Sequence, residues 1–306
     1  MPRNEQKANV AAVVVTYNRL ALLKQCVECL RGQTALCDIL IVNNASTDGT
    51  EEWLAAQADL LSRNTGSNLG GAGGFNYGMR WAVEAEFDYV WVMDDDTLPK
   101  ADALEKLLEA DRLLKGDYGW LSSAALWTDG SECKMNRQKL KKSYYDYSPI
   151  LKYGLVQAEQ ATFVSLFLRR ETILRVGLPI REFFIWGDDI EFTRRIAVRE
   201  GTPCFLVGGS QVVHATKNNE GSNIAMDDPE RIGRYFYAFR NEAYLYRKEG
   251  IKGILRCITK RLWDFIRVIC RKGEKKTRLR ILCHGIDEGL SFHPRVEYLN
   301  QEKQYI

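Results

Sequence analysis

The chain has 306 residues, of which 45% are apolar and 27% are charged, and its formal net charge is +3. This composition is typical of a soluble globular protein and excludes a disordered or fibrous chain. No apolar run reaches the roughly 20 residues that a membrane-spanning helix needs, and the polar start MPRNEQKANV does not resemble a signal peptide. We therefore expect a cytoplasmic protein.

The first half of the chain alternates apolar runs with amphipathic segments. Strands are predicted at residues 10–15, 39–42, 60–63 and 89–93, with helices near 20–30 and 79–85. Such alternation predicts an α/β protein with a doubly wound, mainly parallel sheet. All four strands end in polar or glycine-rich residues, and ligands bind outside the carboxyl ends of such strands. A ligand site is therefore expected at that edge.

The second half is less regular. Residues 134–153 are basic and aromatic and are expected to form a loop or lid, while 161–168 and 205–208 are candidate strands. From about residue 231 to 283 the pattern becomes helical.

Three adjacent carboxylates, Asp94, Asp95 and Asp96, follow the fourth predicted strand directly. They repel one another, and a hard divalent cation such as Mg²⁺ or Mn²⁺ removes that penalty because it prefers carboxylate and phosphate oxygens. The alternative is an acidic turn on a solvated face, which fits poorly because the preceding strand is too apolar for a surface turn. The triplet alone thus predicts a metal and a phosphate.

A glycine-rich segment, residues 68–75 (NLGGAGGF), follows the third predicted strand. Its composition is similar to a dinucleotide-binding fingerprint, but that fingerprint follows a first strand. Glycines here allow a ligand to approach the backbone closely, and a flexible turn is the alternative.

Two further elements have both a chemical and a structural interpretation. Asp188 and Asp189 lie between an aromatic segment and a predicted helix, so either can act as a general base or cap the helix. His214 follows a short strand, where a histidine is either a metal ligand or a structural residue.

Taken in order, these motifs resemble the inverting family 2 glycosyltransferases of the GT-A fold. The resemblance covers roughly residues 8–220, and the NLGGAGGF, DDD and DDxE motifs are most similar to the bacterial galactofuranosyltransferases and rhamnosyltransferases. It is carried by residues 13–19 (VVVTYNR), 41–50 (IVNNASTDGT), 68–75, 94–96, 186–191 (WGDDIE) and His214.

The resemblance implies a role for each site residue. Asp94 and Asp96 hold Mn²⁺ or Mg²⁺, and His214 completes the metal site. Asp189, with Asp188 beside it, is the base that deprotonates the acceptor hydroxyl. The residues that bind the donor are Thr16, Tyr17, Asn18, Asn43, Asn44, Asn68, Gly73, Gly74 and Asp95.

This sequence departs from the family pattern at two positions. Many relatives have an aspartate where Asn43 stands, and Gly187 separates Trp186 from the aspartate pair.

The implied architecture is a GT-A catalytic domain at residues 1–220 and a mostly helical C-terminal region at 221–306. The implied function is transfer of a sugar, with galactofuranose favoured, from a nucleotide-diphosphate donor to a hydroxyl of a cell-surface glycan or lipid-linked acceptor. A rhamnosyltransferase that uses dTDP-rhamnose is the alternative.

Two other classes were weighed. A sugar nucleotidyltransferase would carry a glycine-rich, basic loop after its first strand, and residues 16–19 lack it. A non-catalytic nucleotide-sugar or glycan-binding module would not need the second acidic pair, Asp188 and Asp189.

Residues 251–280 contain 11 Lys or Arg against 2 Asp or Glu, mixed with bulky apolar residues. This pattern suits an interfacial helix against an anionic membrane, on the inner face of the cell membrane. An ordinary helix packed on the catalytic domain with a basic outer face fits equally well. No motif supports nucleic-acid binding. Residues 240–242 either border the acceptor site or have only a packing role.

Overall fold

The computed structural model describes residues 8–143, 145–271 and 273–299. One ten-stranded sheet runs through the described chain in the order β3-β2-β1-β4-β9-β6-β10-β8-β7, and β5 pairs with β10. The strands are β1 (Val10–Thr16), β2 (Asp38–Asn43), β3 (Leu60–Asn64), β4 (Tyr89–Asp94), β5 (Thr97–Pro99), β6 (Leu121–Leu126), β7 (Lys139–Leu140), β8 (Leu155–Gln160), β9 (Leu166–Arg169) and β10 (Phe205–His214).

Helices cover the sheet and extend from one side of it. They are α1 (Leu20–Arg31), α2 (Thr50–Ala55), α3 (Gly70–Glu84), α4 (Ala103–Leu114), α5 (Arg170–Val176), α6 (Asp188–Arg194), α7 (Tyr235–Lys248), α8 (Gly250–Cys270) and α9 (Lys275–Ser291). Short helical turns are η1 (Lys134–Asn136), η2 (Tyr145–Tyr153), η3 (Arg181–Phe183), η4 (Arg195–Arg199) and η5 (Ile232–Arg234). None of the described helices is both long enough and apolar enough to cross a membrane.

The four strands predicted in the first half are present and parallel. In the register of β1, Thr16 lies beside Asn43 of β2, and Val15 lies beside Asp94 of β4. Parallel strands end at one edge of a sheet, so the polar residues that follow them gather there. The expected ligand edge is therefore formed.

The second half of the sheet is mixed, so the term "mainly parallel" describes only the first half. Strand β9 runs antiparallel between β4 and β6, whereas β6 and β10 are parallel. The predicted strand at 161–168 is shorter at its start, because Ser165 has a φ of 64° and β9 begins at Leu166. A left-handed backbone cannot continue a strand. The predicted loop or lid at 134–153 contains η1, β7 and η2.

The glycine-rich segment is helical and not a loop. Helix α3 begins at Gly70, well before the predicted start near residue 79. A Cβ at Gly74 would lie 2.4 Å from Val15 Cγ1, and one at Gly78 would lie 2.4 Å from Val13 Cγ1. The glycines therefore let α3 approach β1 more closely than any side chain would allow.

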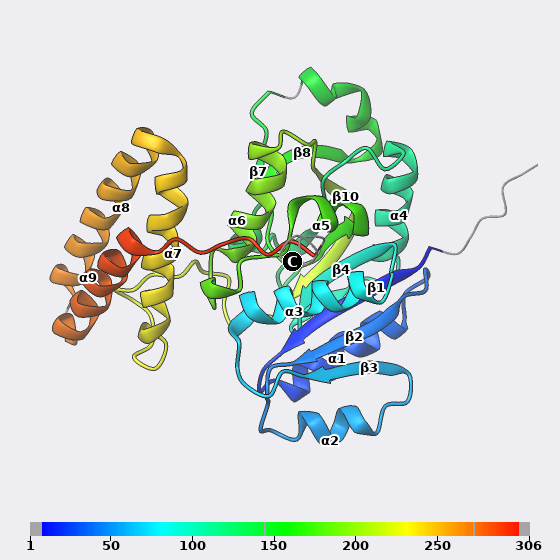
Figure 1. Cartoon of the computed structure of the whole chain (residues 1–306), viewed down its shortest axis with the longest axis horizontal. Coiled ribbons are helices and arrows are strands. Elements are labelled where there is room, and N and C mark those ends of the chain that lie inside the picture. Colours follow the sequence, from blue (N-terminus) through cyan, green and yellow to red (C-terminus); the bar gives the residue numbers. More distant parts are fainter. Residues whose placement is uncertain (1–7, 144, 272, 300–306) are drawn as a thin grey trace, which may run out of the picture.

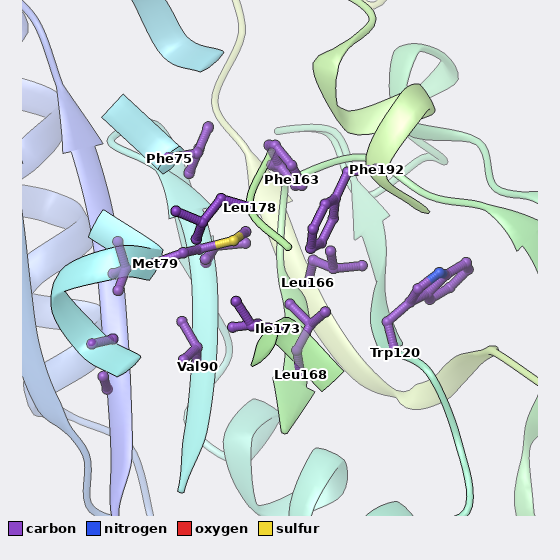
Figure 2. Close-up of a cluster of buried hydrophobic side chains, with 14 of the residues drawn as sticks. Phe75, Met79, Val90, Trp120, Phe163, Leu166, Leu168, Ile173, Leu178 and Phe192 are labelled. Atoms are coloured by element: carbon purple, nitrogen blue, oxygen red, sulfur yellow. The ribbon is translucent and has the colours of Figure 1, made fainter. Parts of the chain in front are cut away.

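An aromatic core joins α3 to α6 (Figure 2). The ring of Phe163 lies 4.7 Å from that of Phe75 on α3 and 5.8 Å from that of Phe192 on α6. Buried aromatic pairs at these separations contribute about 0.5–1.5 kcal/mol each beyond their buried area. The core therefore fixes the helix that carries Asp188 and Asp189 relative to the sheet.

Helices α7, α8 and α9 form a layer at one side of the body, with α7 nearest to it (Figure 1). A small core of their own includes Phe239, Val268 and Leu282. After α9 the chain returns to the body, where the Leu178 amide donates to the Glu297 carbonyl oxygen at 2.8 Å. The predicted division of the chain at residue 220 stays a prediction.

Candidate active site

The three predicted metal ligands lie together at the carboxyl edge of the sheet. Asp94 ends β4, and the pairing of β5 with β10 places His214 opposite Thr97. His214 Nε2 lies 3.1 Å from Asp96 Oδ1. One ligand atom from each of Asp94, Asp96 and His214 lies within 4.8 Å of the others. Their role as ligands stays a prediction, but the arrangement can hold one cation.

The electrostatics of this cluster fit a missing positive charge. Burial, then repulsion from Asp96, raises the pKa of Asp94 to about 7. Burial lowers the pKa of His214, but its hydrogen bonds with Asp96 and Cys133 and the charges of Asp96 and Asp94 together outweigh this and raise the pKa to about 10. A bound divalent cation would ionise the carboxylates and displace the histidine proton. Two carboxylates and one imidazole are also a donor set that Mn²⁺ accepts.

A second residue orients His214. Asn136 Oδ1 lies 2.7 Å from His214 Nδ1, so that nitrogen donates to the amide oxygen and Nε2 faces the aspartates. Such outer partners fix the tautomer of a metal-binding histidine. Asn136 comes from the predicted loop region and no local pattern singled it out.

Arg19 is a further residue that the sequence analysis did not assign to the site. Its Nη1 lies 2.6 Å from Asp96 Oδ2 and 3.3 Å from Asp95 Oδ1, and the side chain is half exposed. Thr16 Oγ1 donates to Asp95 Oδ2 at 2.7 Å. Burial raises the pKa of Asp95 to about 6, and Arg19 opposes that rise. The sequence does contain a signal for Arg19: it is a cation three residues after the first strand, at the sheet edge where the acidic triplet was expected.

Two loops at the ends of β1 and β2 hold each other in place. Asn18 Oδ1 accepts the Thr47 amide at 2.7 Å, and the Asn18 amide donates to Ser46 Oγ at 3.0 Å. Asn18 has a φ of 53°, which asparagine tolerates better than most residues. Beside it, Tyr17 is 44% exposed. Tyr17 and Asn18, both predicted to contact the nucleotide-sugar, therefore line an open rim.

Other predicted donor contacts are buried beneath that rim. Asn43 has no exposed surface, and its Nδ2 donates to Glu51 Oε2 at 2.7 Å. Asn44 is also buried and donates to the Gly70 carbonyl oxygen at 2.9 Å. Both asparagines thus brace the site from within. The asparagine at position 43, where many relatives have an aspartate, has a local explanation. Its partner Glu51 is already a carboxylate and needs a hydrogen-bond donor.

The remaining predicted donor residues lie at the start of α3. The side chain of the exposed Asn68 accepts the Gly70 amide at 2.9 Å. Gly73 and Gly74 are buried in the helix and face Leu69 and Val15. The structure thus gives these glycines a packing role, and their contact with the donor stays a prediction.

Asp188 and Asp189 occupy the first turn of α6, and Gly187 precedes them with a φ of 88°. Gly187 is the N-cap, so neither carboxylate occupies the capping position, but Asp189 Oδ1 accepts the Ile190 amide of the first turn at 2.7 Å. Burial, then Asp189 and more weakly Asp94, raises the pKa of Asp188 well above its ordinary value. Burial raises that of Asp189 to about 6. Asp188 and Asp189 thus form a buried acidic pair, and the charge of Asp94 contributes to the raised pKa of Asp188.

The loop before α6 is held by α7. Asn241 Nδ2 donates to the carbonyl oxygens of Phe183, Ile185 and Trp186 at 2.9, 3.1 and 2.8 Å. Phe184 and Trp186 have φ values of 62° and 64°, a backbone that non-glycine residues seldom adopt. The Phe184 carbonyl oxygen also accepts the Ala72 amide of α3 at 3.1 Å.

A cavity of about 430 Å³ lies between α6, η4, β8, α7 and α8. One of its lining residues is Ile190, which directly follows Asp189 in the chain. More cations than acids line it: Lys139, Arg194, Arg199, Lys248, Arg256 and Lys260 against Glu191, Glu242 and Glu249.

Comparisons with known proteins agree with this geometry. Residues 11–115 match the model of glycosyl transferase family 2. The chain is 27% identical over 296 residues to the galactofuranosyltransferase GlfT1 of Mycobacterium tuberculosis (strain CDC 1551 / Oshkosh), covering 85% of this chain and 94% of that protein. It is 25% identical over 269 residues to the dTDP-rhamnosyl transferase RfbF of Shigella flexneri, covering 81% of this chain and 83% of that protein.

Among solved structures, the fold is similar to that of GalNAc-T7, crystallised with UDP, GalNAc and Mn²⁺, with a TM-score of 0.56 at 13% identity. The match covers 80% of this chain and 52% of that one, and it concerns the fold alone. The family model thus identifies a glycosyl transferase family 2 domain at residues 11–115, and the fold of the chain is similar to that of GT-A glycosyltransferases.

Proposed function

We propose that the protein transfers galactofuranose from a UDP-linked donor to a hydroxyl of a cell-surface glycan or lipid-linked acceptor, with inversion at the anomeric carbon. One observation carries the proposal: Asp94, Asp96 and His214 form a cluster that can hold one cation, and the charge of Asp94 acts on Asp188, which precedes Asp189 in the first turn of α6. The similarity to GlfT1 over nearly its whole length supports the choice of sugar.

The acceptor hydroxyl loses its proton to Asp189. Asp189 Oδ1 already accepts the Ile190 amide at 2.7 Å, so Oδ2 is the oxygen that takes the proton. The acceptor oxygen then bonds to the anomeric carbon while the bond to the diphosphate breaks on the opposite face. This single displacement inverts the anomeric centre and requires no covalent intermediate.

The charge of the departing diphosphate is met by the other half of the site. Asp94, Asp96 and His214 would hold Mn²⁺ or Mg²⁺, and that ion supplies charge neutralisation for the leaving group. Arg19 lies half exposed beside Asp96 and adds a positive charge directed at the same group. Asn18 and Tyr17 at the rim orient the nucleotide, which lowers the entropic part of the barrier.

A rhamnosyltransferase is the second candidate, because the chain also matches RfbF over four-fifths of both proteins. The test is transfer to a saccharide acceptor with UDP-galactofuranose and with dTDP-rhamnose, each with Mn²⁺ and with a chelator. Metal-dependent transfer from the UDP donor supports the proposal. Transfer from dTDP-rhamnose alone would replace it.

Nucleotide binding separates an enzyme from a binding module. We expect UDP with Mn²⁺ to raise the unfolding temperature, because a ligand that binds the folded state stabilises it by mass action. Stabilisation without transfer from either donor would favour a non-catalytic module. No stabilisation by UDP or dTDP would contradict the nucleotide site itself.

A further inference from the structure

Helix α8 exposes a continuous apolar face. Ile251 is 78% exposed, Leu255 and Leu262 are each 59% exposed, and Ile258 is 58% exposed. Residues three and four apart lie on the same side of a helix, so these side chains form one stripe. We name it the apolar stripe, and it consists of Ile251, Ile254, Leu255, Ile258, Leu262, Phe265, Ile266 and Ile269.

A different face of α8 fixes its orientation. Val268 is fully buried, and a Cβ at Gly253 would lie 2.1 Å from the Tyr246 carbonyl oxygen of α7. The buried Arg261 pairs with Glu242 of α7 and, at 3.2 Å, with Asp264. Since α8 is held on α7 by these contacts, the apolar stripe points away from the body. Exposed apolar patches of this extent mark an interaction surface.

A row of cations occupies the polar face of α8, away from the stripe. Lys252, Arg256, Lys260 and Arg267 are exposed and follow helical spacing, and Trp263 lies among them. The Arg267 guanidinium lies 5.1 Å from the centre of the Trp263 ring. Arg256 and Lys260 also pair with acids, at 3.0 Å from Glu249 and 2.5 Å from Glu242. Lysine, arginine and tryptophan beside bulky apolar residues are typical of helices at a bilayer surface.

We infer that α8 lies in the headgroup region of an anionic lipid bilayer, with the apolar stripe at the acyl boundary and the long cationic side chains of its polar face within the headgroup layer. Residues 251–280 carry 11 Lys or Arg against 2 Asp or Glu, so the complementary surface is an anionic one. Helix α8 cannot cross the bilayer, so it lies along it.

This placement has a consequence for the acceptor, which rests on the proposed function. Arg256 and Lys260 of the cation row also line the cavity of about 430 Å³, whose wall continues to Ile190 beside Asp189. A sugar whose lipid anchor stays in the bilayer would bind in this cationic cavity, next to the turn of α6 that carries the proposed base.

Vesicle flotation tests the inference. We expect the protein to float at low salt with vesicles of phosphatidylglycerol and phosphatidylcholine, and to stay at the bottom with pure phosphatidylcholine. The triple variant Leu255→Ser, Ile258→Ser, Leu262→Ser should lose flotation. The control Leu36→Ser, Leu61→Ser removes two exposed leucines from the body and should float as wild type does.

Charge is tested separately with Lys252→Gln and Arg267→Gln, which lie outside the cavity. Each should weaken partitioning about fivefold, the equivalent of about 1 kcal/mol per cation near an anionic surface. Wild type remaining at the bottom, or a triple variant that floats unchanged, would overturn the inference. So would sedimentation of a lipid-free dimer that the triple variant converts to a monomer.

The result of the flotation test can be separated from the result of the transfer assay that tests the proposed function. The triple variant should keep wild-type transfer to a water-soluble acceptor and wild-type stabilisation by UDP with Mn²⁺. Loss of flotation with retained transfer therefore reports on the membrane alone. Flotation without transfer from either donor would contradict only the proposed function.

Discussion

The side-chain amide of Asn241 donates a hydrogen bond of 2.8 Å to the carbonyl oxygen of Trp186, which links helix α7 to the loop before the proposed catalytic carboxylates. The same nitrogen contacts two more carbonyl oxygens of that loop. A non-glycine residue held at positive φ costs about 1–3 kcal/mol and persists only when its surroundings enforce it. Asn241 is part of that enforcement, so α7 acts with the site although it lies beyond residue 220.

We therefore expect Asn241→Ala to lower kcat by about 10- to 100-fold, because small displacements of a catalytic group cost that much. The affinity for UDP should be unchanged, since the loop is not at the predicted nucleotide rim. Steady-state kinetics and calorimetric UDP titration check this. Asn76→Ala is the matched control, because it removes another buried amide bonded to a carbonyl oxygen, that of Pro179 at 2.8 Å. Equal losses of kcat in both variants would contradict a positioning role.

The two carboxylates of α6 should respond differently to amidation. Asp189→Asn removes the base and is expected to slow transfer by about 10²- to 10⁴-fold, the usual contribution of general base catalysis. Asp188→Asn should cost much less, because burial raises the pKa of Asp188 well above its ordinary value and an amide resembles the neutral acid that this shift favours. Single-turnover rates measure both, and UDP-induced stabilisation shows that binding is intact. A larger loss from Asp188→Asn would exchange their roles.

The pH dependence follows from the pKa of Asp189, which burial raises to about 6. The base works when ionised, so kcat/KM should fall about tenfold per pH unit below that value. A profile that stays level down to about pH 4 would exclude Asp189 as the base.

The raised pKa of Asp189 also makes the free energy of unfolding depend on pH, but in the opposite direction to activity. The folded state binds this proton more tightly than the unfolded chain, whose pKa is 3.8, so the stabilising contribution exists at low pH and is lost as pH rises through about 6. Asp189→Asn keeps an oxygen for the Ile190 amide and carries no charge. It should unfold at a higher temperature than wild type at about pH 8, with a difference that shrinks towards pH 4. Unfolding curves at several pH values measure this.

Asn136 should set the metal affinity through His214. We expect Asn136→Leu to weaken Mn²⁺ binding about 10- to 100-fold, as loss of an outer partner of a metal-binding histidine does. Electron paramagnetic resonance of free Mn²⁺ in the presence of UDP measures this without any turnover. Asn219→Ala is the control, since that amide bonds the Glu132 carbonyl oxygen nearby at 2.9 Å and does not contact His214. Unchanged affinity in Asn136→Leu would remove His214 from the metal site.

Asn43 should not tolerate the aspartate that many relatives have. Asn43→Asp places a second buried carboxylate against Glu51, 2.7 Å from the present amide nitrogen, and should cost at least about 2 kcal/mol of unfolding free energy. Adding Glu51→Gln should recover most of that loss, because the pair again has one donor. Urea unfolding of the two single variants and the double variant gives the coupling. Additive effects would contradict the proposed contact.

The parts of the fold that could be predicted are those with a local signature. The apolar run before Asp94 indicates a strand buried on both faces, and the polar residues after each parallel strand must meet at one edge. The early start of α3 could not be predicted, because Gly74 and Gly78 look like a loop until β1 is placed against them.

The residues of the site also differ in whether the sequence around them could predict their role. Asp94, Asp96 and His214 were predicted from their places after strands and from the family resemblance. Asn136 was not assigned to the site, and residues 240–242 were left between bordering the acceptor and packing, because the partners of Asn136 and Asn241 lie 78 and 55–58 residues away in the chain. Such contacts depend on tertiary packing, and no periodicity in the neighbouring sequence encodes them.

The return of the chain after α9 limits how the helical layer can move. Glu297 pairs with Arg80 of α3 at 2.7 Å and with Arg181 at 3.0 Å, while α7 is attached to the body through Asn241. A layer tethered at both ends lacks the rotational freedom of a flap on one hinge. The mouth of the cavity is therefore expected to widen by side-chain rearrangement at Arg194 and Arg256, whose shared partner is Glu249, with the helices staying in place.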